Sequence, residues 1–310
     1  MSLFVLESGL ETRIVDRGRP GTRSLGVPVG GAADRRSLML GNALVGNSPD
    51  AAALEIALKG PRLRADVNVG CILFGAPFEA TRDGYPIEPG HSFTLRAGEE
   101  LRIAGTRRGA RAYLCVRGGL DVPVVLASRS GLEPIRTGDR LACAASELIT
   151  RFCPELEWSE PERVVVSALP GLQADWFSAA EFFEQTFTVA PESNRMGLRL
   201  RGQPISLPGR EMISEPVCPG SVQVANDGQC IVLGVDGQTI GGYPKIAQVI
   251  QADLDALGQL RPGQTLRFAK VTLEEATRRE RERLAFLREW TLRLRLSLDA
   301  FSGERRFASS

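Results

Sequence analysis

Histidine is almost absent from this chain of 310 residues, because His91 is the only one. Zinc sites built from several histidines, H-E-x-x-H proteases and two-histidine mechanisms are therefore excluded. A Ser/His or Cys/His nucleophile would have to use this one residue. His91 follows Pro89-Gly90, a sequence typical of an exposed turn. We predict no metal ion and no histidine-based catalysis.

The chain also lacks long apolar runs and any excess of charge. No run approaches the roughly 20 apolar residues that span a bilayer. The first residues have no basic segment and reach Glu7 too early for a signal peptide. The formal net charge of +1 favours neither nucleic acid nor a membrane surface as a partner. We therefore expect a soluble, cytoplasmic protein, long enough for two domains of ordinary size.

Several local motifs are missing. The six cysteines include no C-x-x-C pair, and five of them lie in or beside apolar segments, so we expect reduced core thiols. There is no G-x-x-x-x-G-K-[ST] loop and no G-x-G-x-x-G after a strand, which argues against a self-contained nucleotide site of either kind. None of the four methionines precedes a lysine. We therefore expect no covalently attached biotin on this chain.

The pattern that is present indicates a mainly β protein. Between Glu55 and Val125, short apolar or alternating segments are separated by Gly and Pro about every ten residues, which is typical of an antiparallel barrel or sandwich. The pattern begins again after a charged connector at residues 154–163. We therefore predict one domain at residues 1–155 and a second at residues 163–272.

Two short segments suggest that the two halves are related. Residues 97–104 and 262–269 share a G-x-x-L-R-[IF]-A pattern. A match of this length fits two copies of one barrel unit.

The last segment, residues 273–310, is predicted to be a helix followed by a tail. The helix is expected from Glu274 to Leu298, and Phe286 and Trp290 lie one turn apart on it. We expect this helix to dock on its own barrel rather than on a partner chain. Its apolar row consists of Leu284, Leu287, Leu294 and Leu298.

Lysine is rare, and one lysine lies in the most informative segment of the chain. Only three lysines, Lys59, Lys245 and Lys270, occur beside 35 arginines. Residues 231–235 read as a buried strand, followed by a glycine-rich turn. The apolar stripe from Ile246 to Leu257 follows a helical period and ends at Gly258, and Pro244 suits a first helical turn.

A lysine at the start of such a helix needs a reason. It opposes the helix dipole at a cost of about 0.3–1 kcal/mol, so we expect an anion to compensate. A compact ammonium suits a site where one oxygen is held or a proton is moved. The alternative is that Lys245 extends into solvent and the glycines only close a turn.

Polar residues in other segments are also candidates for catalysis or ligand binding. Asp34 follows a glycine-rich turn, and helix N-capping explains it as well as a catalytic role does. Arg195 lies in a polar turn, where it could clamp a carboxylate or phosphate. Asp121 and Arg129 lie on one connection and present both signs of charge to a substrate or phosphate pocket. Asp236 stands at the end of a strand, where loops carry sites.

Taken together, the sequence motifs closely resemble the family of biotin-dependent carboxyltransferase subdomains A and B. That family includes the C subunit of 5-oxoprolinase, the proteins called allophanate hydrolase subunit 2 or KipI antagonist, and part of urea carboxylase. The resemblance implies two cyclophilin-like β-barrel subdomains and a partner subunit that carries the other half of the site. The motifs are Gly26–Asp34, Gly41–Asn47, Ala53–Ile56, Arg117–Pro123, Ser193–Gly197, Pro219–Val224 and Asp236–Ala247.

This chain departs from the family pattern at three places. Relatives continue from a Ser-Arg-Ser segment through a longer glycine-rich stretch, whereas here only a few residues separate Ser130 from Gly138. Relatives also show T-V-Q-D and S-G-A-M-D motifs. This chain has T-R-I-V-D at residues 12–16 and G-G-A-A-D at residues 30–34.

The resemblance implies the C subunit of an ATP-dependent amidohydrolase that opens 5-oxoproline to glutamate. Its partners would be a KipI-like B subunit and a third amidohydrolase subunit, with ATP shared with a partner. In this hypothesis Lys245 and Arg195 hold phosphoryl and carboxylate oxygens, and Asp236 or Asp34 directs water. The residues expected around the ligand are Gln238, Thr239, Gly241, Gly242 and Tyr243.

Two alternatives stay open. The first is a regulatory module that binds a KipI-like partner and has no catalysis of its own. The second is the carboxyltransferase component of a biotin-dependent system like urea carboxylase, which requires a carrier and a carboxylase on other chains.

Overall fold

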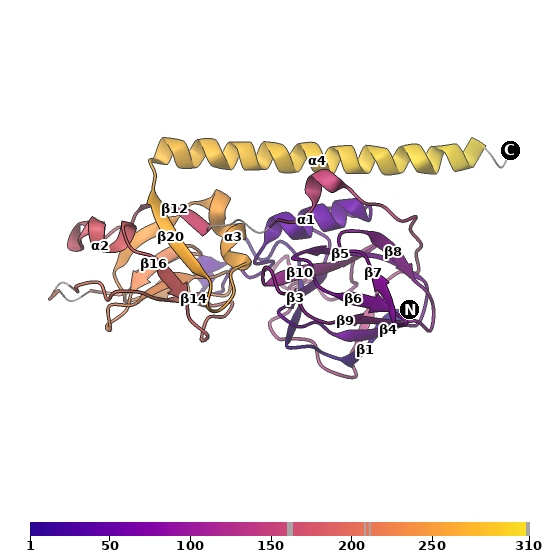
Figure 1. Ribbon diagram of the computed structural model, residues 1–310, viewed down its shortest axis with the longest axis horizontal. Coiled ribbons are helices and arrows are strands. Elements are labelled where there is room, and N and C mark those ends of the chain that lie inside the picture. The colour runs from indigo at the N-terminus through magenta and orange to yellow at the C-terminus, as the bar shows by residue number, and fades with distance from the viewer. Residues whose placement is uncertain (160–163, 208, 211, 308–310) are drawn as a thin grey trace. The chain divides into compact units, whose positions relative to one another are not determined.

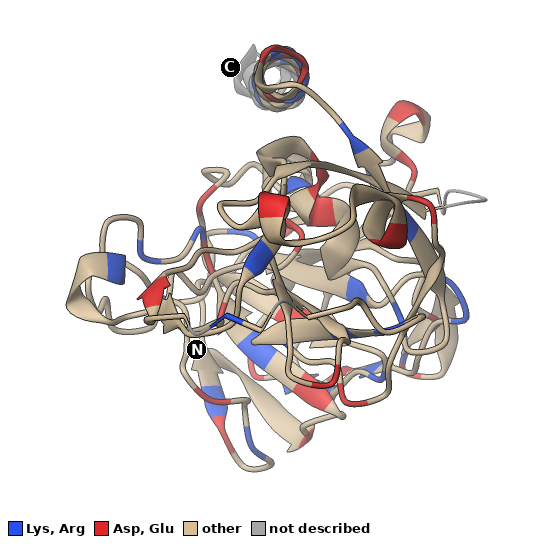
Figure 2. Cartoon of the chain, turned by 90° about the vertical axis from the view of Figure 1, so that its left-hand side faces the viewer, with Lys and Arg blue, Asp and Glu red and all other residues tan. Residues whose placement is uncertain are grey.

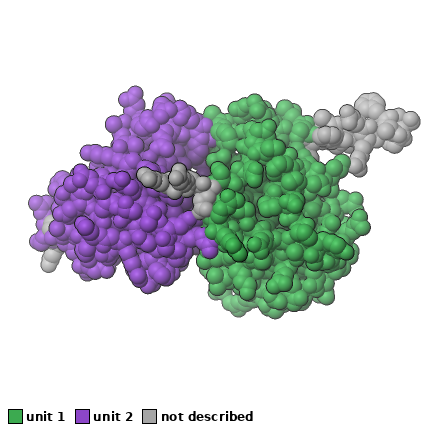
Figure 3. All heavy atoms as spheres, viewed as in Figure 1, with its two compact units in different colours: residues 1–18, 35–160, 284–310 green, residues 19–34, 161–283 purple. Residues whose placement is uncertain are grey.

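The computed structural model describes residues 1–159, 164–207, 209–210 and 212–307, and for residues 298–307 the backbone only. The chain divides into two compact units (Figure 3). The first comprises Met1–Gly18, Arg35–Glu160 and Leu284–Ser310, and the second Arg19–Asp34 and Pro161–Arg283. The predicted second domain begins at residue 163, which lies outside the described residues.

The first unit contains two antiparallel sheets that enclose one apolar core. Leu63, Leu101 and Leu114 are among its fully buried side chains. One sheet has the order β11 (Arg140–Ala142), β1 (Ser2–Glu7), β4 (Arg62–Ala65), β9 (Glu100–Ile103), β6 (Ala80–Arg82), β7 (Tyr85–Ile87). The other has the order β2 (Glu11–Val15), β3 (Ala53–Ala57), β10 (Arg111–Val116), β5 (Val69–Gly75), β8 (Ser92–Leu95).

Helix α1 (Arg35–Leu44) packs on strands β5 and β10 of the second of these sheets (Figure 1). The approach is close because Gly41 faces the sheet. A Cβ atom there would lie 2.9 Å from the Cys115 sulfur and 3.0 Å from the Phe74 Cβ. The helix therefore needs glycine at this position.

The second unit is built around a closed barrel. Strands β12 and β20 pair in parallel, and the other neighbouring strands pair antiparallel. The rings of Phe182, Phe187 and Phe268 pack together in its core, with centroids 4.6–5.6 Å apart, and those of Phe182 and Phe268 are stacked. The barrel order is β12 (Val164–Pro170), β19 (Lys245–Val249), β16 (Ser221–Val224), β17 (Cys230–Leu233), β14 (Gly197–Arg201), β13 (Phe187–Val189), β20 (Thr265–Lys270).

Shorter elements surround the barrel strands. A separate two-stranded ribbon pairs β15 (Glu215–Pro216) with β18 (Ile240–Gly241). The helices of the second unit are α2 (Ala179–Phe183) and α3 (Leu254–Gly258), and its 3-10 turns are at Arg23–Leu25, Ala174–Trp176 and Gln251–Asp253. A further 3-10 turn, Pro154–Leu156, belongs to the first unit. The predicted class, mainly β with a C-terminal helix, is confirmed.

The predicted helix after Pro244 is wrong. Lys245–Val249 is strand β19, and helix appears only at α3. Spacings of three and four residues among a few apolar side chains do not separate a short buried strand from a helix. The β-branched residues favour the strand, and pairing with β12 and β16 on both sides supplies its hydrogen bonds. Lys245 therefore does not oppose a helix dipole, and no anion is needed to offset one.

The two copies of the G-x-x-L-R-[IF]-A pattern adopt the same local structure. Each begins with a glycine in the left-handed region, Gly98 with φ 88° and Gly263 with φ 87°. Each then continues into a strand, β9 in the first unit and β20 in the second. The pattern therefore marks one turn-and-strand element that occurs once in each unit.

Helix α4 (Leu273–Phe307) is longer than predicted. Leu287 and Leu294 are buried as expected, whereas Leu284 is 36% exposed and the Leu298 side chain lies outside the described residues. The Phe286 and Trp290 rings lie 6.2 Å apart. Acidic and basic residues surround the helix axis (Figure 2). No described helix is both long and apolar enough for a membrane span.

Candidate functional site

Lys245 lies in a barrel strand of the second unit and is 4% exposed. It pairs across the sheet with Gln223, where an irregularity interrupts the β16–β19 register. The Lys245 Nζ atom lies 2.5 Å from Oε2 of Glu215. The Lys245 backbone N–H donates to Oε1 of Gln173 at 3.0 Å, and Gln173 Nε2 donates to Glu215 Oε2 at 3.2 Å. A buried ammonium, a carboxylate and an amide thus form one connected group.

Glu215 was not among the residues predicted from the sequence. It lies on the short ribbon strand β15, opposite Gly241 of β18, so no periodic pattern singled it out. The hydrogen bond from Lys245, followed by that from Gln173, lowers the pKa of Glu215 below its ordinary value. The carboxyl group is therefore ionised at neutral pH. Its side chain is 39% exposed, so solvent reaches the ion pair on the carboxylate side.

Several of the predicted ligand-contact residues lie against the side chain of Gln223, the residue that pairs with Lys245 across the sheet. Gln238 Nε2 donates to Gln223 Oε1 at 3.4 Å, and Gln223 Nε2 donates to the Tyr243 carbonyl at 3.3 Å. A Cβ atom at residue 241 would lie 2.5 Å from Gln223 Nε2, so Gly241 lets the Gln223 amide group come close to the backbone. The Thr239 carbonyl accepts from the backbone of Val217 at 3.0 Å. Gly242 is exposed, and Tyr243 is 37% exposed.

Arg195, in the turn before β14, and Asp236, in the loop before β18, form a second ion pair. Arg195 Nε lies 2.7 Å from one carboxylate oxygen of Asp236, and Nη2 lies 3.0 Å from the other. Arg195 Nη2 also donates to the Gly31 carbonyl at 2.7 Å. The predicted arginine clamp therefore holds a carboxylate of its own chain. Both oxygens of Asp236 contact this guanidinium, so Asp236 orients Arg195.

A further arginine borders the same loop. Arg23 Nη2 donates to the Gln238 carbonyl at 3.2 Å, and Arg23 Nη1 is buried without a hydrogen-bond partner among the described residues. The buried Arg19 approaches Gly30, whose Cβ position would lie 3.4 Å from Arg19 Nη1 and 3.7 Å from Asp236 Oδ1. Cationic groups therefore gather around residues 234–239.

The remaining predicted residues fall into two groups. Asp34 is buried in the second unit, and its Oδ2 accepts a 2.7 Å hydrogen bond from Gln259. Asp121 and Arg129 are exposed residues of the first unit. The structure therefore brings Lys245, Gln238 and their neighbours together within one unit, and Asp121 and Arg129 belong to the other.

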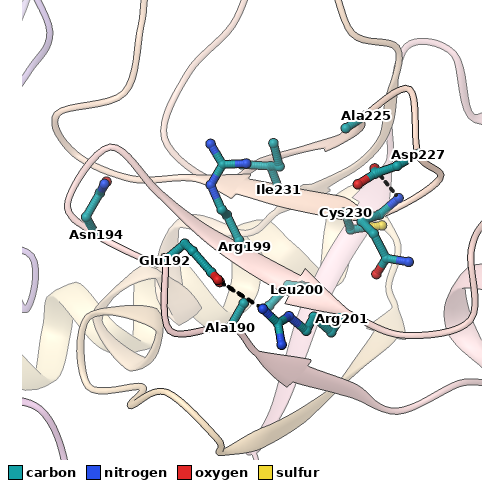
Figure 4. A pocket seen from close by; sticks show the side chains of 11 residues that line it. Ala190, Glu192, Asn194, Arg199, Leu200, Arg201, Ala225, Asp227, Cys230 and Ile231 are labelled. Atoms are coloured by element: carbon teal, nitrogen blue, oxygen red, sulfur yellow. Dashed lines mark hydrogen bonds and ion pairs between the residues drawn. The ribbon is translucent and has the colours of Figure 1, made fainter.

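A separate cavity of about 450 Å³ opens beside strands β14 and β17 (Figure 4). Glu192 and Arg201 form an exposed 3.0 Å ion pair at its edge. None of the predicted site residues lines it. The lining residues are Ala190, Glu192, Asn194, Arg199, Leu200, Arg201, Ala225, Asp227, Gln229, Cys230 and Ile231.

All six cysteines are free thiols, and four of them are buried as expected. Burial raises the pKa of Cys71 and of Cys230 to about 12. Cys218 is exposed, which the sequence did not indicate. The buried thiols are thus packing residues.

Residues 25–270 match the family model described as carboxyltransferase domain, subdomain A and B, and the chain belongs to this family.

Individual relatives extend the match over most of the chain. The chain is 36% identical over 309 residues to the 5-oxoprolinase C subunit of Escherichia coli (strain K12), covering 94% of this chain and 98% of that protein. The crystal structure of TTHA0988 superposes with a TM-score of 0.79 at 36% identity, covering 86% of this chain and 55% of that one. The Kluyveromyces lactis urea carboxylase structure gives a TM-score of 0.85 at 26% identity, covering 93% of this chain and 29% of that one.

Proposed function

We propose that this chain is the C subunit of an ATP-dependent 5-oxoprolinase, which opens 5-oxoproline to glutamate with partner subunits. The observation that carries the proposal is the end-to-end similarity to a protein named as the C subunit of 5-oxoprolinase. The ion pair of the buried Lys245 with Glu215 supports it, because a reaction on an acidic lactam needs a held cation and an ionised carboxylate.

The chemistry explains the need for ATP. A lactam is an unreactive amide, and water is a poor nucleophile for it at neutral pH. Transfer of the γ-phosphoryl group from ATP to the lactam oxygen breaks the bond to the ADP oxygen and leaves a carbon that water attacks. Cleavage of the ring C–N bond, with the amine taking a proton, then leaves an acyl phosphate. A second water attacks this acyl phosphate, which releases phosphate and gives glutamate. Such catalysis depends on positioning and on charge stabilisation.

We assign these tasks within the second unit. Lys245 holds a phosphoryl or carboxylate oxygen of the ligand. Glu215, next to it and open to solvent, accepts a proton from water, the role that Asp236 and Asp34 were expected to fill. Gln238 and Gln223 contact the ligand through their amide groups. Arg195, fixed by Asp236, supplies a second cation.

The partners complete the proposal. A KipI-like B subunit and a third amidohydrolase subunit supply the rest of the site, and ATP is shared with one of them. No biotin is attached to this chain. The complex is a cytoplasmic hydrolase in this proposal.

The test is reconstitution of the three purified subunits with 5-oxoproline and ATP. Glutamate and ADP should form together. The Lys245→Met variant keeps the volume and apolar stem of the side chain but removes the ammonium, so the rate should fall at least about a hundredfold. The matched control is Arg107→Met, which removes an exposed cation of the first unit and should leave the rate unchanged. Full activity of Lys245→Met would remove the assigned role.

Carboxyl transfer is a second candidate, favoured by the fold match to urea carboxylase. It predicts that the chain, with a biotin carrier and a carboxylase, carboxylates urea in the absence of 5-oxoproline. A purely regulatory role predicts assembly with a KipI-like partner and no turnover of either substrate. The same reconstitution therefore separates the three possibilities.

A further inference from the structure

We propose that the turn at residues 124–129 of the first unit is a preformed docking element for a partner subunit. The partner surface it fits is an apolar recess with a carboxylate at its rim. This inference rests on the proposed function only in requiring that the chain works with a partner. In this proposal the Arg129 side chain binds the partner subunit and not the substrate.

The first observation is the backbone of the turn. Val125 and Ser128 exchange backbone hydrogen bonds of 2.8 and 3.2 Å, which close a two-residue loop. The two residues between them, Leu126 and Ala127, have φ values of 51° and 59°. Such a hairpin turn normally carries Asn-Gly, because residues other than Gly, Asn and Asp are strained in this region. Strain in two successive residues is kept where function requires the side chains.

The second observation is the anchor beneath the turn. The buried Asp16 carboxylate accepts hydrogen bonds from Ser128 Oγ at 2.6 Å, Ser130 Oγ at 2.7 Å and the Arg129 backbone N–H at 2.6 Å. The Gly18 N–H adds a fourth at 2.8 Å. Four donors on one carboxylate fix the end of the turn, so the strained conformation is held before any partner arrives.

The third observation is what the turn displays. Val124, Val125 and Leu126 are 55%, 56% and 46% exposed, although all three are apolar. The Arg129 side chain is exposed, and no ion pair or hydrogen bond from it occurs within the described residues. A stability-driven sequence would place polar residues here. Apolar side chains beside an exposed cation have the composition of an interface anchor.

A partner subunit is the occupant that the relatives favour. The E. coli relative is named as a subunit, and this chain covers almost all of it. The same module makes up 55% of TTHA0988 and 29% of urea carboxylase, so those chains carry further segments beside it. Where such segments are separate chains, a rigid docking element must replace the covalent link. Preorganisation lowers the entropy lost on binding.

The experiment uses the full chain and the purified KipI-like partner, with affinity measured by calorimetry. The variant Leu126→Asn/Ala127→Gly installs the preferred turn sequence, so it should fold with an unchanged or higher Tm. Its affinity should fall at least about tenfold, because one large apolar contact is lost. Arg129→Glu should weaken binding further and reduce its salt dependence. Tyr85→Asn, 75% exposed on β7, is the matched control and should bind normally.

Each result of this experiment supports or overturns the docking role of the turn. Normal binding by the Asn-Gly variant, or no binding by the unaltered chain, overturns it. A change of oligomeric state in the variant without the partner would instead identify a second copy of this chain as the occupant, which also overturns it. A complex that assembles through the turn but does not open 5-oxoproline would refute the proposed function and leave the docking element intact.

Discussion

Replacing Asp16 by asparagine should release the 124–130 segment without removing any apolar packing. The carboxylate accepts four hydrogen bonds, three at Oδ1 and one at Oδ2. An asparagine can keep the three at its oxygen. Its amide nitrogen would face the Arg129 N–H, 2.6 Å from the present oxygen, and both groups are donors. One hydrogen bond is therefore replaced by a repulsive contact.

The expected loss of stability in Asp16→Asn follows from the lost negative charge and from the new contact between two hydrogen-bond donors. Hydrogen bonds to an ionised group are worth about 1.5–3 kcal/mol, against about 1 kcal/mol for neutral pairs. Weakening three bonds and losing one predicts a loss of about 2–4 kcal/mol in the free energy of unfolding of the first unit. For a unit of this size the Tm should fall by roughly 5–12 °C.

The pH dependence gives a second, independent check. Burial raises the pKa of Asp16, but the hydrogen bonds from Ser128, Arg129, Ser130 and Gly18 outweigh it, and the pKa lies below its ordinary value of 3.8. A lowered folded-state pKa contributes stability that is complete above the unfolded-state pKa. It is lost as the pH falls through the folded-state pKa. The difference in the free energy of unfolding between the unaltered chain and Asp16→Asn should be constant near neutral pH and become smaller below about pH 4.

The assay is urea unfolding of both proteins from about pH 3 to about pH 8, a range that brackets the titration of carboxyl groups, with hydrogen exchange at the amides of residues 125–130. Exchange there should be faster in Asp16→Asn. Asp121→Asn, an exposed carboxylate on the same connection, is the control and should change stability by less than about 0.5 kcal/mol. Two results would refute the role of Asp16 in holding the turn at residues 124–129. One is a stability difference between the two proteins that stays unchanged to the acid end of this range, and the other is the absence of a difference at neutral pH.

Three further results are expected. Lys245→Met should unfold at nearly the same temperature as the unaltered chain. An apolar residue of similar volume replaces a buried charge, and the Glu215 carboxylate left without its cation is 39% exposed and stays hydrated. A drop above about 10 °C would contradict this. Leu126→Asn/Ala127→Gly should raise the free energy of unfolding by about 1–3 kcal/mol in urea melts, since two strained residues are relieved, and destabilisation would rule out strain. Cys218 should react first with a thiol reagent and Cys71 only on unfolding, as mass spectrometry of labelled peptides would show.

Part of the site was predictable because its residue types are unusual in their surroundings. Lys245 is one of three lysines in an arginine-rich chain, and the glycines before it allow close backbone approach. The partner of that lysine was not predictable. Glu215 lies 30 residues earlier, on a two-residue strand with no periodicity of its own. Only the pairing of β15 with β18 places its carboxylate beside the ammonium.

Arg195 was also predicted from the sequence, whereas its pairing with Asp236 was not. Its chemistry indicated a bidentate clamp on a carboxylate, and the structure contains such a clamp, but the carboxylate is that of Asp236. Residue type determines what a side chain can bind. The fold determines which partner is within reach, because strand order brings distant segments to one place.

The sequence by itself determined the β-rich class, the free thiols of the core and the polar segments from which the site is made, since hydrophobic period and turn residues are local properties. The tertiary structure decided that Lys245 stands in a strand rather than at a helix start, because edge-to-edge hydrogen bonds with two neighbours outweigh a weak local period. It also decided that two strained residues near Asp16 are held outward, because the anchoring serines lie more than 110 residues away from that carboxylate along the chain.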